Sequence, residues 1–153
     1  MTNSNNLIDS LEVYVLNNPD DVKPHWVSHF IVPTANELLI KIKNKNGNSG
    51  FGLATSYSDI SPIIKPFSNG LEDFIIGQDP FCPEKIYESI SKLTDTRISS
   101  EKGWGKEALI RISAALDIAC WDLMGKSSNI PLYKLFGGYR NKIPVYVTCG
   151  YYR

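Results

Sequence analysis

The stretch ELLIKIKNKNGNSGFGLAT, residues 37–55, constrains the fold of this chain more than any other. Leu38, Ile40 and Ile42 recur at every second position, which is typical of a β-strand with one buried face. Asn46-Gly47 follows, and both residues tolerate positive φ, so a tight hairpin turn is predicted there. Residues 51–55 form the returning strand, and residues 7–16 provide another strand. The first third of the chain is therefore predicted to be a three-stranded antiparallel meander.

The middle of the chain has helical periodicity instead. Apolar residues three and four apart predict two short helices over residues 60–75, a helix from Pro83, and a long helix over Lys106–Met124. Residues 94–105 are predicted to form a loop, and Gly125 is predicted to end the long helix. The long helix carries one apolar stripe, formed by Leu109, Ile112, Leu116, Cys120 and Leu123.

A β-rich run, KIPVYVTCG, ends this pattern, and we expect a strand over Pro144–Cys149. Val145 and Val147 flank Tyr146, so the run has apolar side chains on both faces, as buried parallel strands do. Strands first and helices next indicate an α+β fold, a meander followed by a helical bundle, with one lone final strand. A buried strand with no sequel suggests that the chain is cut off from something larger.

Composition excludes some classes of protein. The chain has 153 residues and a formal net charge of zero, so nothing in it favours nucleic acid as a partner. Its apolar runs are shorter than the roughly 20 residues of a membrane span. Three cysteines stand far apart without a CxxC pair, so neither a disulfide framework nor a zinc site is indicated. Reduced thiols in a cytoplasmic protein are the simplest interpretation.

Two aspartates on the long helix could be mistaken for an acid–base pair. Asp117 and Asp122 are five residues apart, which places them about 140° apart around a helix. They cannot face one substrate together. We expect both to have structural roles, anchoring a neighbouring loop or a cationic side chain. Ala114, Ala115 and Ala119 are expected to let another element approach closely.

His25 and His29 could be mistaken for a zinc site, because histidines four residues apart on a helix can hold zinc. Pro24 and Pro33 flank a stretch rich in Val, Phe and Ile, so an extended chain is favoured. Four extended residues span about 13 Å, too far for both rings to share one metal ion. Exposed or hydrogen-bonded histidines are the plainer interpretation, and a substrate-facing loop is the alternative.

The run AALDIACWDLMGKSSNIPLYKLFGG, residues 114–138, followed after three residues by KIPVYVTCG, resembles the mandelate racemase/muconate lactonizing enzyme group of the enolase superfamily. The GNSGFGLAT meander looks similar as well. The resemblance implies that residues 1–140 are an amino-terminal capping domain and that residues 141–153 hold the first strand of a missing (β/α)8-type barrel. It implies Mg²⁺-assisted abstraction of a proton next to a carboxylate in the full-length parent.

By the same resemblance, the base and the metal ligands belong to later barrel strands, so no catalytic residue and no metal ligand is expected in this chain. The capping domain would contribute loops over the barrel mouth. The side chains expected to meet a small carboxylate substrate are His25, Trp26, His29, Tyr57 and Tyr151. No cofactor is expected to bind this fragment alone, and the parent is expected to be a homo-oligomer.

An acid-sugar dehydratase is the expected activity of the parent. A racemase, epimerase or cycloisomerase of the same superfamily is the runner-up. The third possibility, from a different class, is a complete noncatalytic binding module. The abrupt end at Arg153 argues against that possibility.

Overall fold

The computed structural model describes residues 4–17, 23–27, 29–32 and 35–147. Its main sheet has the strand order β1-β4-β5, and both pairs are antiparallel. These strands are β1 (Ile8–Leu16), β4 (Asn36–Asn44) and β5 (Ser49–Ser56). The predicted meander is thus confirmed, with a turn at Gly47, where φ is 87°. A separate two-stranded hairpin pairs β2 (His25–Val27) with β3 (Phe30–Val32).

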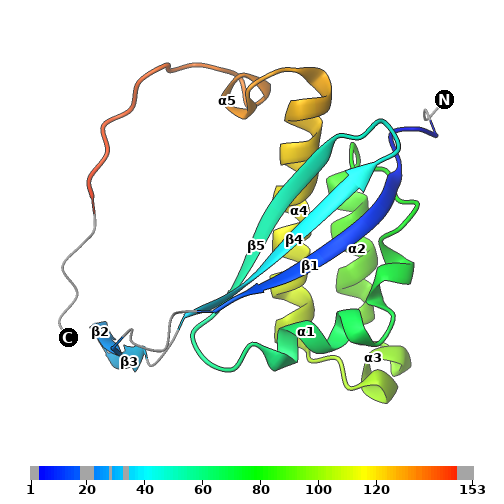
Figure 1. Ribbon diagram of the computed structural model, residues 1–153, viewed down its shortest axis with the longest axis vertical. Helices are drawn as coiled ribbons and strands as arrows, with labels where there is room; N and C mark the ends of the chain where they lie inside the picture. Colours follow the sequence, from blue (N-terminus) through cyan, green and yellow to red (C-terminus); the bar gives the residue numbers. More distant parts are fainter. Residues whose placement is uncertain (1–3, 18–22, 28, 33–34, 148–153) are drawn as a thin grey trace.

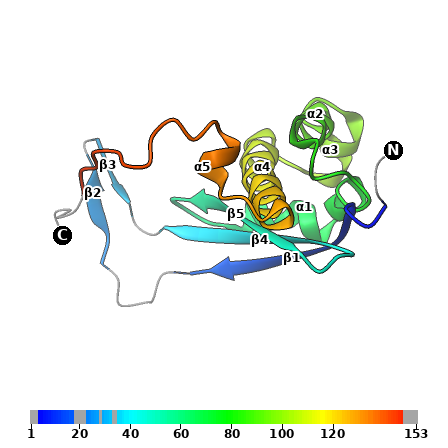
Figure 2. The same cartoon turned by 90° about the horizontal axis from the view of Figure 1, so that it is seen from above.

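The helices form a second layer on one face of the main sheet (Figures 1 and 2). The longest, α4 (Lys106–Ser128), lies along β5 and β4 and also contacts α2 (Pro83–Leu93). Among the described helices, none is long and apolar enough to cross a membrane. The remaining helical elements are α1 (Ser61–Ser68), the 3-10 helix η1 (Leu71–Phe74), α3 (Arg97–Lys102) and α5 (Leu132–Leu135).

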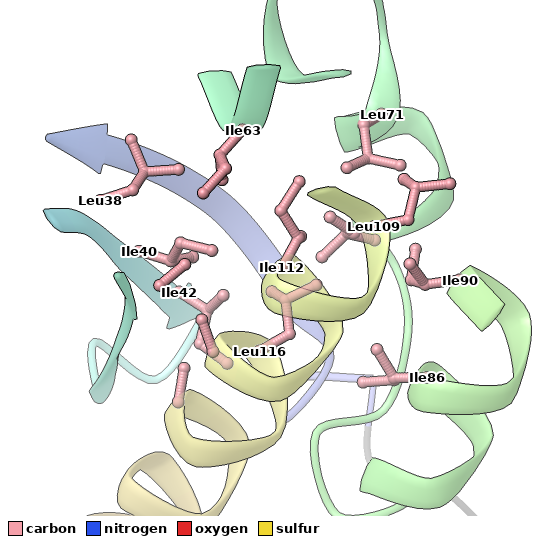
Figure 3. Packing of buried hydrophobic residues seen from close by; sticks show 14 of the residues in the cluster. Leu38, Ile40, Ile42, Ile63, Leu71, Ile86, Ile90, Leu109, Ile112 and Leu116 are labelled. Atoms are coloured by element: carbon pink, nitrogen blue, oxygen red, sulfur yellow. The ribbon is translucent and has the colours of Figure 1, made fainter. Parts of the chain in front are cut away.

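The core lies between the two layers. Leu38, Ile40 and Ile42 point from β4 toward α4, and all three are fully buried (Figure 3). Every member of the predicted stripe on α4 is buried as well. Ile86 and Ile90 on α2 complete the cluster from the other side. The alternation on β4 and the helical spacing on α4 were therefore interpreted correctly, because each element buries only one face.

Two glycines bring α4 unusually close to the sheet. A Cβ atom added to Gly52 would lie 1.9 Å from the carbonyl oxygen of Ala115, and one added to Gly50 would lie 1.9 Å from that of Ala119. Both alanines are fully buried. The small residues of β5 and α4 thus let the helix backbone lie directly on the strand, as expected for Ala115 and Ala119. The same expectation is wrong for Ala114, which is exposed on the side of α4 away from the sheet.

Three further details differ from the sequence predictions, two of them in helices. Residues 97–102 form α3 rather than loop, because the Thr96 side chain accepts a hydrogen bond from the Ser99 amide and Gly103 ends the helix at φ 64°. Gly125 does not end α4. The helix continues to Ser128, and Asn129 takes the left-handed conformation at φ 53°. Gly125 instead makes room for the returning chain, since a Cβ there would lie 3.1 Å from the Ile130 oxygen.

The third difference concerns the final strand. Residues 142–147 have no regular secondary structure, and the side chains of Val145 and Val147 are 79% and 83% exposed. Residues with high β-propensity become a strand only when a neighbouring strand accepts and donates their hydrogen bonds. The rest of the predicted strand, residues 148–149, lies outside the described residues.

Candidate functional site

The turn that follows β5 carries Tyr57, one of the predicted substrate-binding side chains. Asn36, at the start of β4, donates a hydrogen bond to the Ser58 carbonyl over 3.1 Å. Ser56 Oγ donates to the Asp59 carbonyl over 3.2 Å. These contacts tie the turn to the end of the sheet, while the Tyr57 side chain remains 53% exposed. The phenol is therefore displayed to solvent from a well-anchored backbone.

The same turn leads directly into α1. Asp59 Oδ1 accepts hydrogen bonds from the Ser61 amide at 3.0 Å and the Ser61 hydroxyl at 2.8 Å. These two bonds hold the pKa of Asp59 below its ordinary value. The carboxylate therefore stays ionised and engaged with the first turn of the helix. It acts as a local anchor for the turn rather than as a proton donor.

Arg111 on α4 reaches the turn from the helix layer. Its guanidinium donates to the carbonyl of Thr55 and pairs with Glu107 over 2.7 Å. A recess of about 210 Å³ beside it is lined by Ser56, Ser58, Asp59, Pro62, Ile63, Gly105, Glu107, Ala108 and Arg111. Because the single cation among these lining residues is already engaged and two carboxylates accompany it, the recess does not suit a carboxylate ligand.

The hairpin β2–β3 carries three more of the predicted side chains. Trp26 lies opposite Ile31, so the two side chains share one face, and Trp26 is 56% exposed. His25 lies opposite Val32, and His29 is in the turn between the strands. The expected extended conformation is confirmed at His25 but is wrong for the whole run from His25 to His29, because the chain turns at His29 to pair β3 with β2. Within the described ranges, no group of three or more His, Cys, Asp or Glu side chains could hold a metal ion.

The hairpin and the Tyr57 turn lie at the same end of the main sheet. β4 begins and β5 ends there, since Asn36 pairs with Ser56, and the hairpin lies beyond this end in both views (Figures 1 and 2). His25, Trp26, His29 and Tyr57 thus come from two segments at one end of the molecule. Tyr151, the fifth predicted side chain, lies outside the described residues.

The sequence analysis missed Arg111. The spacing of Glu107 and Arg111 indicates an ion pair on one helix face, and that pair is present. The contact of Arg111 with Thr55 joins residues 56 positions apart, and no local sequence pattern predicts it. Cys120 is fully buried, and burial raises the pKa of its thiol to about 12, so it is unsuited to act as a nucleophile.

The two aspartates of α4 do have separate structural surroundings. Asp122 Oδ2 accepts a hydrogen bond from the Phe51 amide at 2.9 Å and pairs with Lys126 at 2.6 Å. Asp117 is half-buried, and burial together with the nearby Glu84 raises its pKa, against a hydrogen bond with the Trp121 side chain. Asp122 therefore ties α4 to β5, as expected. The expected anchoring of a loop or a cation is wrong for Asp117, whose hydrogen bond is with Trp121 of the same helix, and the fold disfavours its ionised form.

These surroundings predict opposite outcomes for two substitutions. Asp122→Ala should lower the free energy of unfolding by roughly 1–3 kcal/mol, because it removes a charge-assisted hydrogen bond and an ion pair. Asp117→Asn should leave stability at pH 7 unchanged or slightly raised. Urea denaturation of both variants measures the difference, and a larger loss for Asp117→Asn would contradict these assignments.

The pH dependence of the same variants gives a further check. A carboxyl whose pKa is raised in the folded state contributes stability below its unfolded pKa, and that contribution is lost as pH rises through the folded pKa. Any gain in the free energy of unfolding of Asp117→Asn over the wild-type chain should thus shrink as pH falls toward 3.8, the ordinary pKa of an Asp side chain. A constant difference across this range would contradict the assignment.

Comparison with known proteins places these features in a family. The family model for the "Mandelate racemase / muconate lactonizing enzyme, N-terminal domain" matches residues 10–137. A hydrophobic dipeptide epimerase of Enterococcus faecalis is 29% identical over 127 residues, 78% of this chain and 31% of that protein. An arabinonate dehydratase of Saccharolobus solfataricus is 27% identical over 116 residues, 75% of this chain and 29% of that protein.

A solved structure is similar as well. A racemase from Streptomyces coelicolor A3(2), determined with bound magnesium, superposes with a TM-score of 0.69 at 27% identity, over 87% of this chain and 36% of that one. The chain therefore spans about a third of the length of each of these relatives.

Proposed function

This chain belongs to the mandelate racemase/muconate lactonizing enzyme family, whose N-terminal domain it matches, and we propose that it caps the active site of a longer enzyme that removes a proton next to a carboxylate. The domain boundary would lie near residue 140, with residues 141–153 leading into a barrel. The observation that carries this proposal is the display of Trp26 and Tyr57 on two segments at one end of the sheet.

In this proposal each displayed side chain meets a different part of the substrate. The Tyr57 hydroxyl donates a hydrogen bond to a polar group of the substrate, while the indole of Trp26 covers an apolar part and excludes water. His25 precedes Trp26 in β2 and so faces the other side of the hairpin, where it would hydrogen-bond a different polar group of the substrate, and His29 would do so from the turn. Tyr151 would approach from the first barrel strand.

Magnesium is proposed for the parent enzyme, where it would stabilise the negative charge that develops on the substrate carboxylate after proton loss. The described part of this chain has no cluster of acidic or histidine ligands for it. The metal ligands and the base would therefore come from another part of the parent. The contribution of this chain is to bind, orient and enclose the substrate, in what we propose to be a cytoplasmic enzyme.

Acid-sugar dehydration is the activity that we favour, because hydrogen-bonding groups such as His25, His29 and Tyr57 suit a polyhydroxylated acid, and a relative is an arabinonate dehydratase. Epimerisation of a dipeptide is the second candidate. The exposed Trp26–Ile31 pair on the hairpin offers an apolar contact for a hydrophobic side chain, and another relative is a hydrophobic dipeptide epimerase.

The test uses the product of the whole open reading frame that contains this chain, assayed with Mg²⁺ in D2O and followed by NMR. A dehydratase converts an acid sugar to a keto acid with loss of water. An epimerase instead replaces the α-proton of a dipeptide by deuterium without loss of water. Turnover of neither class, with intact fold, would favour a noncatalytic binding module and contradict the proposal.

Substitution of Tyr57 tests the capping role directly. Tyr57→Ala in the same full-length protein should raise KM roughly tenfold, because a hydrogen bond to the substrate and an excluded-water contact are lost. Tyr87→Ala is the matched control, since Tyr87 is 49% exposed on α2, away from this end of the sheet. Equal kinetic effects of the two variants would contradict the assignment of Tyr57 to the substrate.

A further inference from the structure

A hollow separates the turn that carries Tyr57 from the helix behind it. The recess of about 210 Å³ has Ser56, Ser58 and Asp59 of the turn on one side and the first residues of α4 on the other. Protein interiors are close-packed, and neighbouring atoms usually fix the position of a segment. Because the recess leaves a space behind this turn, hydrogen bonds take a larger share in holding it.

A hydrogen bond of Arg111 crosses from the helix layer to the sheet. Its Nη1, on α4, donates to the Thr55 carbonyl near the end of β5, two residues before Tyr57. β5 is an outer strand of the described sheet, with β4 on one side, and the guanidinium takes the place of a strand partner on the other. The direction in which β5 enters the turn therefore depends on Arg111.

Glu107, one turn earlier on α4, orients this guanidinium. Glu107 Oε1 accepts hydrogen bonds from Arg111 Nε at 3.1 Å and from Nη2 at 2.7 Å. The guanidinium is planar and its N–H groups point in fixed directions, so a carboxylate bound to Nε and Nη2 also determines where Nη1 points. The ion pair on the helix and the contact with the sheet are thus two parts of one rigid arrangement.

We propose that Arg111 is a positioning residue, which holds the Tyr57 hydroxyl where the substrate binds. The inference rests on the proposed function and deepens it, because it requires Tyr57 to contact the substrate. The groups of a binding site must lie within about 0.5 Å of their productive positions. With a recess behind it, the turn has room to move by more than this once the Thr55 carbonyl is released. Arg111 acts through the turn and does not contact the substrate itself.

Arg111→Met tests this role in the product of the whole open reading frame, assayed with the acid sugar or dipeptide that it converts in D2O. Methionine keeps the aliphatic part of the side chain and has no N–H donor. KM should rise about fivefold with kcat unchanged, because a misplaced Tyr57 binds the substrate less well. An unchanged KM in a folded variant, as judged by circular dichroism, would overturn the proposal.

The matched control is Arg97→Met. Arg97 on α3 forms the same kind of ion pair, with Glu101 at 2.6 Å, and its side chain is 90% exposed. Its replacement removes an arginine and an ion pair between residues four apart, but no contact with β5. KM of this variant should equal the wild-type value. An equal rise of KM in the Arg97 and Arg111 variants would overturn the proposal.

Combining Arg111→Met with Tyr57→Ala shows whether Arg111 acts through Tyr57. Once the phenol is absent its position no longer matters, so KM of the double variant should match that of Tyr57→Ala to within about twofold. A residue that only stabilises the fold would instead raise KM by the same factor in both backgrounds. Multiplied effects of the two substitutions would therefore overturn the proposal.

Amide hydrogen exchange of residues 56–60, followed by mass spectrometry, provides a measurement that needs no substrate. These amides should exchange about tenfold faster in Arg111→Met than in the wild-type protein, and at the wild-type rate in Arg97→Met. Glu107→Ala should also accelerate the exchange, by a smaller factor. The Glu107 side chain is 80% exposed, so this variant does not disturb the core and decides the question if Arg111→Met fails to fold.

The exchange measurement separates failure of this inference from failure of the proposed function. Unchanged exchange in the folded variants would overturn the positioning role and leave the proposed function intact. Faster exchange, together with a wild-type KM in Tyr57→Ala, would overturn the assignment of Tyr57 to the substrate and the positioning role with it. Faster exchange and a raised KM in Arg111→Met, both absent in Arg97→Met, would support the proposal.

Discussion

Replacing Gly52 with alanine should lower the free energy of unfolding by at least about 3 kcal/mol, the upper part of the range for overpacked cores. The added Cβ would lie 1.9 Å from the Ala115 oxygen and 2.8 Å from its carbonyl carbon. Both are backbone atoms of a long helix, so no side chain can rotate away. The whole of α4 would have to move off the sheet, and thermal or urea denaturation would measure the loss.

The matched control for this substitution is Gly105→Ala. Gly105 has an ordinary φ of −72°, and a Cβ there would meet nothing within 4 Å. Its replacement should cost about 1 kcal/mol or less, because glycine is preferred over alanine at an N-cap position. If the Gly52 and Gly105 variants unfold at the same denaturant concentration, the close approach of α4 to β5 is not a feature of the folded protein.

Leu116→Ala should have the next largest effect, a loss of about 2–5 kcal/mol, which is the usual range for emptying a fully buried leucine site. Leu116 is 0% exposed and lies between β4 and α2 in the centre of the core (Figure 3). A loss of this size is a substantial fraction of the roughly 5–15 kcal/mol that stabilises a typical domain.

Ile118→Ala, two residues further along the same helix, removes a similar amount of apolar side chain from the exposed side. It should cost about 0.5 kcal/mol or less. Urea denaturation of both variants under identical conditions gives the comparison. A cost at Ile118 equal to that at Leu116 would mean that the outer side of α4 is covered and not free.

The fold could be predicted where a residue's neighbours in the sequence determine its surroundings. Alternation at Leu38, Ile40 and Ile42 sufficed for β4, and the spacing from Leu109 to Leu123 sufficed for the buried side of α4. Gly125 was misinterpreted, because its role is to accommodate Ile130 and Leu132, which return to the helix in three dimensions. A glycine in a helical sequence signals an end or a close contact, and the sequence alone does not distinguish them.

The candidate site, like the fold, could be predicted only in part. Trp26 and Tyr57 were predicted from the resemblance to the family's capping loops. The structure shows both side chains exposed at one end of the sheet, and their contact with a substrate stays a prediction. The support behind Tyr57 could not be predicted, since Arg111 reaches Thr55 from a helix 56 residues away.

The contacts between α4 and the free edge of β5 also determine where another strand could add to this sheet. The Phe51 amide is bound by Asp122, and the Thr55 carbonyl is bound by Arg111. An added strand would hydrogen-bond through these groups. Two side chains of one helix therefore shield this edge from strand addition. Recruitment of an extended peptide by β-augmentation, or the first pairing step of an amyloid-like assembly, would therefore begin at β1.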